Sequence, residues 1–198
     1  MIVTCAFREP YLTHNVNQLR AITNYPVLAF RDCLPYSEGI VRNNVVTRFQ
    51  KSLYGFKPHA IQAALDMGHK YIVWFDPSVM PVEPVDTIFD QLKDTDMLII
   101  PGESHIKNMC NQKAFDHFGI NPDVNHIGGT IYAMNFNMER TRQAFKYWIE
   151  AEQAGIFGTQ DEFMAGHWAD EACMSLAMAK AGIEQKPLVF KYKNQKDG

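Results

Sequence analysis

The sequence has 198 residues, 46% of them hydrophobic and 21% charged, which is enough for the core of one globular domain. Its formal net charge of -3, with no basic stripe, argues against a nucleic-acid-binding protein. The four cysteines lie far apart and form no Cys-x-x-Cys pair, which argues against a disulfide scaffold or a zinc site and favours free thiols in a reducing compartment.

No part of the sequence resembles a targeting or membrane segment. The N-terminus lacks a basic region followed by a long apolar run, so we expect no signal peptide. No apolar run approaches the roughly 20 residues of a membrane-spanning helix. We therefore expect a cytoplasmic protein with a single domain over residues 1–198. The polar, lysine-rich residues 191–198 are typical of a frayed end, or of the place where a longer protein was cut.

Strand-like and helix-like runs alternate along the chain. Apolar runs predict strands at residues 2–7, 27–30, 71–75, 97–100, 130–134 and 187–192, and we expect Pro101-Gly102 to end the fourth of these. Helical spacing of apolar residues predicts helices at residues 13–23, 58–68, 85–92, 139–154 and 170–181. Residues 103–127 have no clear period, and residues 155–168 are predicted to form a mobile loop.

This alternation predicts an α/β fold with a mostly parallel central sheet and helices on both faces. Ligands of such sheets bind outside the carboxyl ends of the strands. Asp76 follows the apolar strand at residues 71–75 directly, so we expect its carboxylate at such an end. A carboxylate held there suits a hard divalent cation that bridges to phosphate oxygens. The alternative is a loop aspartate that caps the turn before Pro77.

Several segments, in this order, resemble the GT-A glycosyltransferases. The matching segments are the opening strand at residues 2–7, Tyr54-Gly55-Phe56-Lys57-Pro58, the strand at 71–75 with Asp76-Pro77-Ser78, Glu83-Pro84, Asn125-His126-Ile127-Gly128-Gly129-Thr130 and Trp168-Ala169-Asp170-Glu171. Together they cover most of the chain. The small size is also similar to glycosyltransferase domains of large algal viruses, which would place the protein in the host cytoplasm.

The resemblance implies a GT-A (Rossmann-like) fold and transfer of a sugar from a UDP-sugar to a hydroxyl of a glycan or glycoprotein acceptor. It also implies Mn²⁺ or Mg²⁺ as cofactor and retention of the anomeric configuration. The implied catalytic residues are Asp170 and Glu171, and the implied metal ligands are Asp76 and Ser78. The implied nucleotide-sugar-binding residues are Thr4, Ala6, Phe7, Arg8, Lys57, Phe75, Asp76, Pro77, Ser78, Gly128 and Gly129.

The sequence departs from the family pattern at the metal site. Ser78 replaces the second acid of Asp-x-Asp, and residues 182–198 contain no histidine where many members supply a metal ligand. His126 and His167 are candidate substitutes, although a lone histidine is more often structural. We therefore expect weak metal binding without nucleotide, with the diphosphate completing the site.

Each remaining candidate also has a structural interpretation. Lys57 could simply be solvated, as most lysines are, and Arg8 and Arg48 are similar, less supported candidates for phosphate binding. Gly128-Gly129 could be a plain turn before a strand. Asp170 and Glu171 could cap their helix and interact with its dipole. The pair Asp161-Glu162, in the predicted loop, competes with them for the catalytic role.

Two other functions remain open. Asp76-Pro77-Ser78-Val79 also resembles the nucleophile loop of haloacid-dehalogenase-type phosphatases, although Ser78 stands where their second acid would be. The missing acid also allows a non-catalytic sugar-nucleotide-binding module that keeps the fold without turnover.

Overall fold

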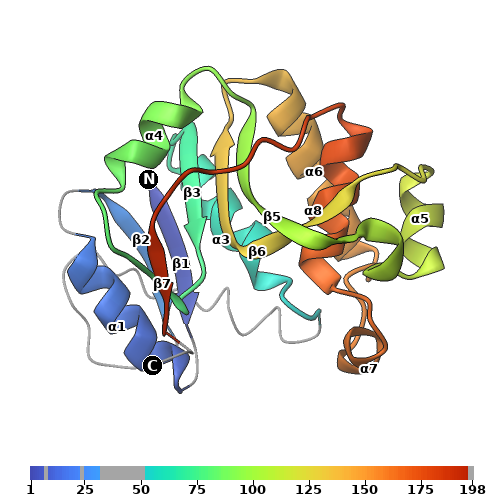
Figure 1. Cartoon of the computed structure of the whole chain (residues 1–198), viewed down its shortest axis with the longest axis horizontal. Coiled ribbons are helices and arrows are strands. Elements are labelled where there is room, and N and C mark those ends of the chain that lie inside the picture. Colours follow the sequence, from blue (N-terminus) through green and yellow to red (C-terminus); the bar gives the residue numbers. More distant parts are fainter. Residues whose placement is uncertain (7–8, 23–24, 32–51, 196–198) are drawn as a thin grey trace.

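The computed structural model describes residues 1–6, 9–22, 25–31 and 52–195, and Figure 1 shows how their elements are arranged. The strands are β1 (Ile2–Ala6), β2 (Val27–Arg31), β3 (Tyr71–Phe75), β4 (Val79–Pro81), β5 (Met97–His105), β6 (Asn125–Asn135) and β7 (Tyr192–Asn194). The helices are α1 (Tyr11–Ala21), α3 (Phe56–Asp66), α4 (Asp86–Leu92), α5 (Gln112–Phe118), α6 (Glu139–Gln153), α7 (Gln160–Met164) and α8 (Ala169–Lys180), with a 3-10 turn at Ile106–Asn108.

The central sheet has the strand order β2-β1-β3-β6-β5. β1 pairs in parallel with β2 and β3, whereas β6 pairs antiparallel with β3 and β5. β6 therefore runs opposite to the other strands of this sheet. A smaller sheet joins β4 and β7. The predicted α/β fold with a mostly parallel central sheet is confirmed, and the reversed direction of β6 is what the sequence pattern did not predict.

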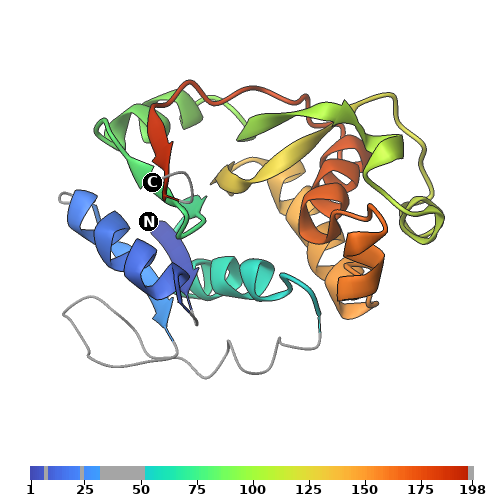
Figure 2. The same ribbon diagram turned by 60° about the horizontal axis from the view of Figure 1, so that its bottom comes forward.

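Successive side chains of the buried strands pack alternately into two hydrophobic cores, one on each face of the sheet. On β3, Ile72 and Trp74 pack in the core that α3, α5, α6 and α8 cover, and Val73 and Phe75 pack in the core beneath α4. Figure 2 shows α3 and α4 on opposite sides of the strands. Because both faces of β3 are buried, the strand is a continuous apolar run, as expected for a central strand of such a sheet.

The strongly periodic segments form the predicted elements. The strand at Tyr71–Phe75 is confirmed residue for residue, and the five predicted helices form with shifted ends. α3 begins at Phe56, before the predicted start at Pro58, and Pro58 still lies in its first turn, where its missing N–H costs little. Gly68 follows this helix with a φ of +89°, a conformation that glycine adopts without strain.

Pro101 and Gly102 do not end β5, so the prediction of a strand over residues 97–100 alone is wrong. The strand continues to His105, and its pairing with β6 shifts register between Ile99 and Ile100 and again after Pro101. β5 lies at the edge of the sheet. An edge strand tolerates proline and a bulge because one of its sides has no partner strand.

Three other boundaries differ from the prediction. β6 already begins at Asn125, so the Gly128-Gly129 pair lies inside a strand and is not a turn before it. The predicted loop at residues 155–168 contains α7, which a capping box between Thr159 and Glu162 starts. The last strand is β7, which pairs with β4 inside the tail predicted to be frayed, while Pro187 makes only an isolated bridge to Ile99.

In the part of the chain that the structure describes, no helix is long and apolar enough to cross a membrane.

Candidate functional site

A pocket opens where β1 and β3 end, at the edge of the sheet where the sequence predicted a ligand site. The backbone N–H of Asp76 donates to the carbonyl of Thr130, at 2.8 Å, so the end of β3 stays attached to β6. The pocket is lined by Cys5, Ala6, Tyr11, Tyr54, Phe56, Lys57, Asp76, Pro77, Ser78, Gly129, Thr130, Phe163, Trp168, Asp170 and Glu171. Residues from distant parts of the sequence thus meet in one cavity.

The turn after β3 holds the Asp76 carboxylate in a fixed orientation. Its Oδ1 accepts hydrogen bonds from the Ser78 backbone N–H, at 2.9 Å, and from the Ser78 hydroxyl, at 2.6 Å. The fully buried side chain of Gln18 donates to the carbonyls of Asp76 and Val79, both at 2.7 Å. Helix α1 therefore fixes the position of this turn through Gln18. Asp76 is both a turn residue, through its hydrogen bonds to Ser78, and a lining residue of the pocket.

The donors at this turn suit a cation that also binds phosphate. Asp76 offers a carboxylate and Ser78 a hydroxyl, both oxygen ligands of the type that Mg²⁺ and Mn²⁺ prefer. Within residues 1–6, 9–22, 25–31 and 52–195, no group of three or more His, Cys, Asp and Glu side chains is placed to hold a metal ion alone. Mg²⁺ is commonly held by one or two carboxylates together with substrate phosphates and water. The residues fit a cation that a nucleotide diphosphate helps to bind.

A buried ion pair forms the back of the pocket. Lys57 Nζ lies 2.6 Å from Asp170 Oδ2, and the two side chains are only 4% and 3% exposed. Lys57 also donates to the Gly129 carbonyl at 3.1 Å, and the Tyr132 hydroxyl donates to Asp170 Oδ2 at 3.2 Å. Lys57 is therefore not a solvated lysine. Asp170 is not a helix cap either, because its carboxylate is occupied by Lys57 and Tyr132.

The charges around Lys57 keep it protonated. Burial alone would lower the pKa of Lys57, but the carboxylates of Asp170, Asp76 and Glu171 outweigh this effect, and the pKa lies above its ordinary value. Burial and the nearby Asp170 carboxylate likewise raise the pKa of Tyr132 well above its ordinary value, so its hydroxyl remains a hydrogen-bond donor. The charged groups lining the described pocket are thus one ammonium and three carboxylates.

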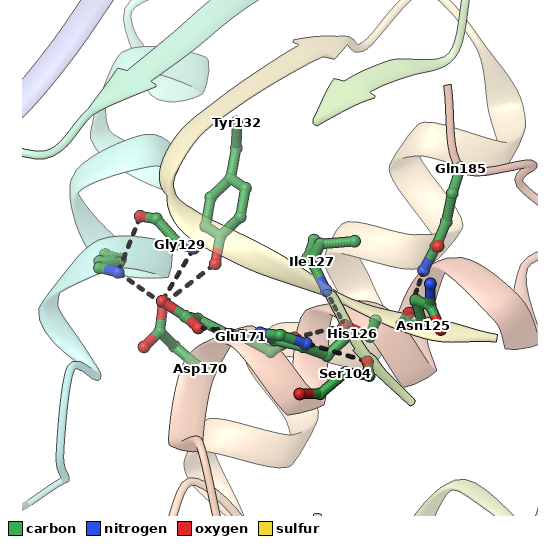
Figure 3. Close-up of polar contacts among 11 residues, drawn as sticks. Ser104, Asn125, His126, Ile127, Gly129, Tyr132, Asp170, Glu171 and Gln185 are labelled. Carbon is green, nitrogen blue, oxygen red and sulfur yellow. Dashed lines mark hydrogen bonds and ion pairs between the residues drawn. The ribbon is translucent and has the colours of Figure 1, made fainter. Parts of the chain in front are cut away.

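Glu171 is the more accessible of the two predicted catalytic acids. Its Oε1 accepts a hydrogen bond from the Gly129 backbone N–H at 2.8 Å, which Figure 3 shows together with the Asp170 contacts. Its Oε2 lies 4.0 Å from His126 Nε2, and the Glu171 side chain is 19% exposed. Burial, and then repulsion by Asp170, raise the pKa of Glu171 to about 7. A carboxyl group that titrates near neutrality can both donate and accept a proton.

The two glycines of β6 have different surroundings. A Cβ atom on Gly129 would lie 2.6 Å from Glu171 Oε1 and 2.9 Å from Lys57 Nζ, whereas one on Gly128 would make only ordinary contacts, the nearest at 3.5 Å. Successive residues of a strand face opposite sides, which accounts for the difference. A Cβ at Gly129 would therefore force the side chains of Glu171 and Lys57 to shift, whereas Gly128 does not line the pocket.

Neither candidate histidine lies in the turn after β3. His126 Nδ1 is 3.1 Å from the Ser104 carbonyl (Figure 3), and its ring packs against Trp168. His167 is buried, with Nε2 2.8 Å from the Ile156 carbonyl, and burial lowers its pKa. The competing acid pair does not line the pocket: Asp161 is exposed, and Glu162 forms the capping box of α7.

Other predicted binding residues lie outside the pocket or outside the described residues. Thr4 is fully buried and its hydroxyl accepts a hydrogen bond from Asn15 on α1, while Phe75 is buried in the core beneath α4. Both point to the side of the sheet that α1 and α4 cover. Phe7, Arg8 and Arg48 lie outside the described residues. The residues of β1 that line the pocket are Cys5 and Ala6.

The sequence interpretation did not single out the aromatic side chains of the pocket. They are Tyr11, Tyr54, Phe56, Phe163 and Trp168. Tyr54 and Phe56 stand inside the Tyr54-Gly55-Phe56-Lys57-Pro58 motif, and Trp168 opens the Trp168-Ala169-Asp170-Glu171 motif, so membership of these motifs was the available signal.

No family model matches the sequence, and no curated protein gives a significant match to it. Solved structures do match the fold. The bifunctional glycosyltransferase WbbM, without ligand, superposes with a TM-score of 0.59 at 10% identity, over 95% of this chain and 38% of that one. This chain therefore corresponds to well under half of the WbbM chain.

Two further structures match over most of this chain. Mouse xyloside xylosyltransferase 1, without ligand, gives a TM-score of 0.57 at 10% identity, over 94% of this chain and 84% of that one. An active-site mutant of LgtC gives 0.54 at 13% identity, over 89% and 69%. At these identities the likeness concerns the fold, and the fold of this chain is that of the GT-A glycosyltransferases.

Proposed function

We propose that this protein is a glycosyltransferase that moves a sugar from a UDP-sugar to a hydroxyl group of a glycan. The observation that carries the proposal is the convergence of Asp76, Lys57, Asp170 and Glu171 in one pocket, at the strand ends of a fold that glycosyltransferases share. WbbM and xyloside xylosyltransferase 1 are glycosyltransferases by name, and their activity comes to this chain as part of the proposal.

Charge supports a role for a divalent cation. The three carboxylates exceed the single ammonium among the described lining residues, so a nucleotide diphosphate would meet net negative charge. Asp76 and Ser78 would hold Mn²⁺ or Mg²⁺ together with the diphosphate. When bound, the cation supplies positive charge that stabilises the leaving diphosphate. The assignment of uridine rests on the family resemblance.

The reaction requires two bond changes and one proton transfer. The acceptor oxygen forms a bond to the anomeric carbon as the bond from that carbon to the diphosphate oxygen breaks, with its electron pair leaving on the diphosphate. With retention, as the resemblance implies, the departing phosphate oxygen takes the acceptor proton. Glu171 Oε2 has no hydrogen-bond donor among the described residues, so it can accept a bond from a sugar hydroxyl. Next to Glu171, Lys57 donates a hydrogen bond to the Gly129 carbonyl and Asp170 accepts one from the Tyr132 hydroxyl.

Binding and turnover test this proposal together. Calorimetry with UDP, GDP and CMP, each with and without Mn²⁺, should give the tightest binding for UDP and a large loss after chelation. Common UDP-sugars are then supplied with a mixed glycan pool, and UDP release and product are measured, with the anomeric configuration read by NMR. Equal affinity for the three nucleotides, or binding unaffected by a chelator, would contradict the proposal.

The Asp76→Asn variant tests the proposed role of the Asp76 carboxylate. The asparagine carbonyl can still accept the hydrogen bonds from Ser78, so we expect the fold to remain. Loss of the charge should lower turnover by two to three decades, about 3 to 4 kcal/mol. An active Asp76→Asn enzyme would make Asp76 a turn residue only. Tight UDP binding without any transfer or hydrolysis would instead identify a non-catalytic module, and an aspartyl-phosphate on Asp76 would indicate a phosphatase.

A further inference from the structure

One end of the pocket is aromatic. The ring of Phe163 lies 6.0 Å from that of Tyr54 and 5.5 Å from that of Trp168. Tyr54 lies in the segment before α3, whereas Phe163 lies on α7 and Trp168 directly precedes α8, so the rings come from parts of the chain that are far apart in sequence. Trp168 is 38% exposed, whereas Trp74 and Trp148, the other two tryptophans of the chain, are fully buried. The indole of Trp168 is thus the one tryptophan surface available to a ligand.

The aromatic end is held in place by the chain around it. The Trp168 backbone N–H donates to the Met109 carbonyl at 2.9 Å, and the neighbouring His167 ring is buried against the Ile156 carbonyl. Among the described residues, the non-glycine residues with positive φ are Tyr54, at 60°, and Ala169, at 34°, and both adjoin this end. Such backbone costs about 1 kcal/mol or more and is concentrated at functional sites. Exposure of Trp168 is therefore a feature of an ordered structure and not of a frayed end.

The aromatic end continues directly into the acidic part of the pocket. The Trp168 ring is 5.9 Å from the ring of His126, which in turn lies 4.0 Å from Glu171 Oε2. Tyr54 also adjoins the charged part of the pocket, because Lys57 Nζ lies 5.1 Å from the centre of the Tyr54 ring. A ligand on these rings would therefore present its edge to Glu171. Asp76, Ser78 and the end of β1 also line this pocket and are left for the nucleotide.

We propose that Trp168, with Phe163 and Tyr54, forms the acceptor subsite, and that the acceptor is a pyranoside whose C–H face stacks on the indole. This inference rests on the proposed glycosyltransferase function. An aromatic ring has a negative face, which attracts the positive C–H hydrogens of a sugar ring. The hydroxyl groups on the rim of the sugar need polar partners, and Glu171 Oε2 and the Trp168 indole N–H, which has no partner among the described residues, provide an acceptor and a donor.

Tryptophan fluorescence gives a direct test. The protein is saturated with UDP and Mn²⁺, and acrylamide quenching is measured with a panel of methyl glycosides of the common pyranoses. At least one glycoside should protect the fluorescence, whereas sorbitol, which has hydroxyls but no ring face, should not. In Trp168→Phe the protection should disappear, because the remaining tryptophans are fully buried.

Kinetics separate this subsite from the donor site. With the best glycoside as acceptor, Trp168→Ala should raise the acceptor KM tenfold or more while UDP affinity stays the same, and Trp168→Phe should recover part of the loss. Met67→Ala, which removes another exposed hydrophobic side chain outside the pocket, should have no effect.

The outcomes distinguish the two proposals. If UDP binds in an Asp76-dependent way but no glycoside protects Trp168, or if UDP alone gives the full protection, the acceptor subsite is overturned and the glycosyltransferase proposal stands. If UDP does not bind at all, the proposed function is overturned, and the acceptor subsite that rests on it is overturned with it. A loss of UDP affinity in Trp168→Ala would likewise overturn the assignment, because it would place the nucleotide on these rings.

Discussion

The ion pair between Lys57 and Asp170 can be tested by its contribution to stability. Asp170→Asn keeps the size of the side chain and removes its charge, which leaves the Lys57 ammonium buried without its closest partner. Breaking a buried pair by removing one partner typically costs about 3 to 5 kcal/mol. We expect the lower end, about 3 kcal/mol, because Lys57 Nζ keeps the Gly129 carbonyl at 3.1 Å and the Glu171 carboxylate nearby.

This loss should be visible in thermal unfolding. For a chain of this size, 1 kcal/mol corresponds to roughly 2 to 4 °C in Tm, so Asp170→Asn should lower Tm by about 6 to 12 °C. Lys57→Met should also destabilise the protein, since it leaves the Asp170 carboxylate buried with only the Tyr132 hydroxyl as donor. Without the lysine, burial favours the protonated acid, so this cost should be small at low pH and should grow as the pH rises above about 4.

The double variant Lys57→Met/Asp170→Asn completes the cycle. It removes both charges, so it should be more stable than the sum of the single changes predicts, with a coupling energy of about 2 kcal/mol or more. The exposed pair Lys93 and Asp90, with side chains 65% and 69% exposed, is the control, and the same cycle there should give less than about 1 kcal/mol. Additive effects at Lys57 and Asp170, measured by denaturant unfolding, would refute the inference of a tight buried pair.

Two other changes test the site around this pair. Gly129→Ala should lower both stability and transfer activity, because its Cβ would lie 2.6 Å from Glu171 Oε1, whereas Gly128→Ala, with 3.5 Å to its nearest neighbour, should be nearly silent in thermal unfolding and in UDP release. For Glu171, the pKa raised by burial to about 7 means that the native state holds its proton above the ordinary value of 4.5, so native stability should fall as the pH rises from about 4.5 to 7, by at most roughly 3 kcal/mol. Glu171→Gln should lack this fall, and a wild-type stability that rises over the same pH range would contradict the assignment.

The elements that the sequence predicted well are those whose signal is local. The run at Tyr71–Phe75 is apolar because both faces of β3 are covered, and Asp76 follows it, so the strand and the carboxylate at its end could be inferred together. β5 could not be inferred in full, because the tolerance for Pro101 depends on its position at the sheet edge, which is a property of the whole sheet. The same holds for the direction of β6.

The candidate site was predicted as separate residues but not as an arrangement. Lys57, Asp76, Gly129, Asp170 and Glu171 were each named on a motif, and the structure brings all of them to one pocket. Their contacts were beyond inference, since the Lys57 ammonium reaches Asp170 across 113 residues of sequence. The capping interpretation of Asp170 failed for this reason: helix caps are local, and a long-range partner occupies the carboxylate instead.

The charge balance of the pocket determines how the ion pair should be interpreted functionally. Lys57 and Asp170 carry opposite charges, so the double variant leaves the net charge of the lining residues unchanged, while either single variant changes it. A single variant therefore confounds lost stability with an altered field at Asp76 and Glu171. If the stable double variant still binds UDP with Mn²⁺ and still transfers sugar, the pair acts only as packing behind Glu171. If it binds UDP but loses transfer, the pair must orient the sugar or Glu171, because neither the fold nor the net charge has changed.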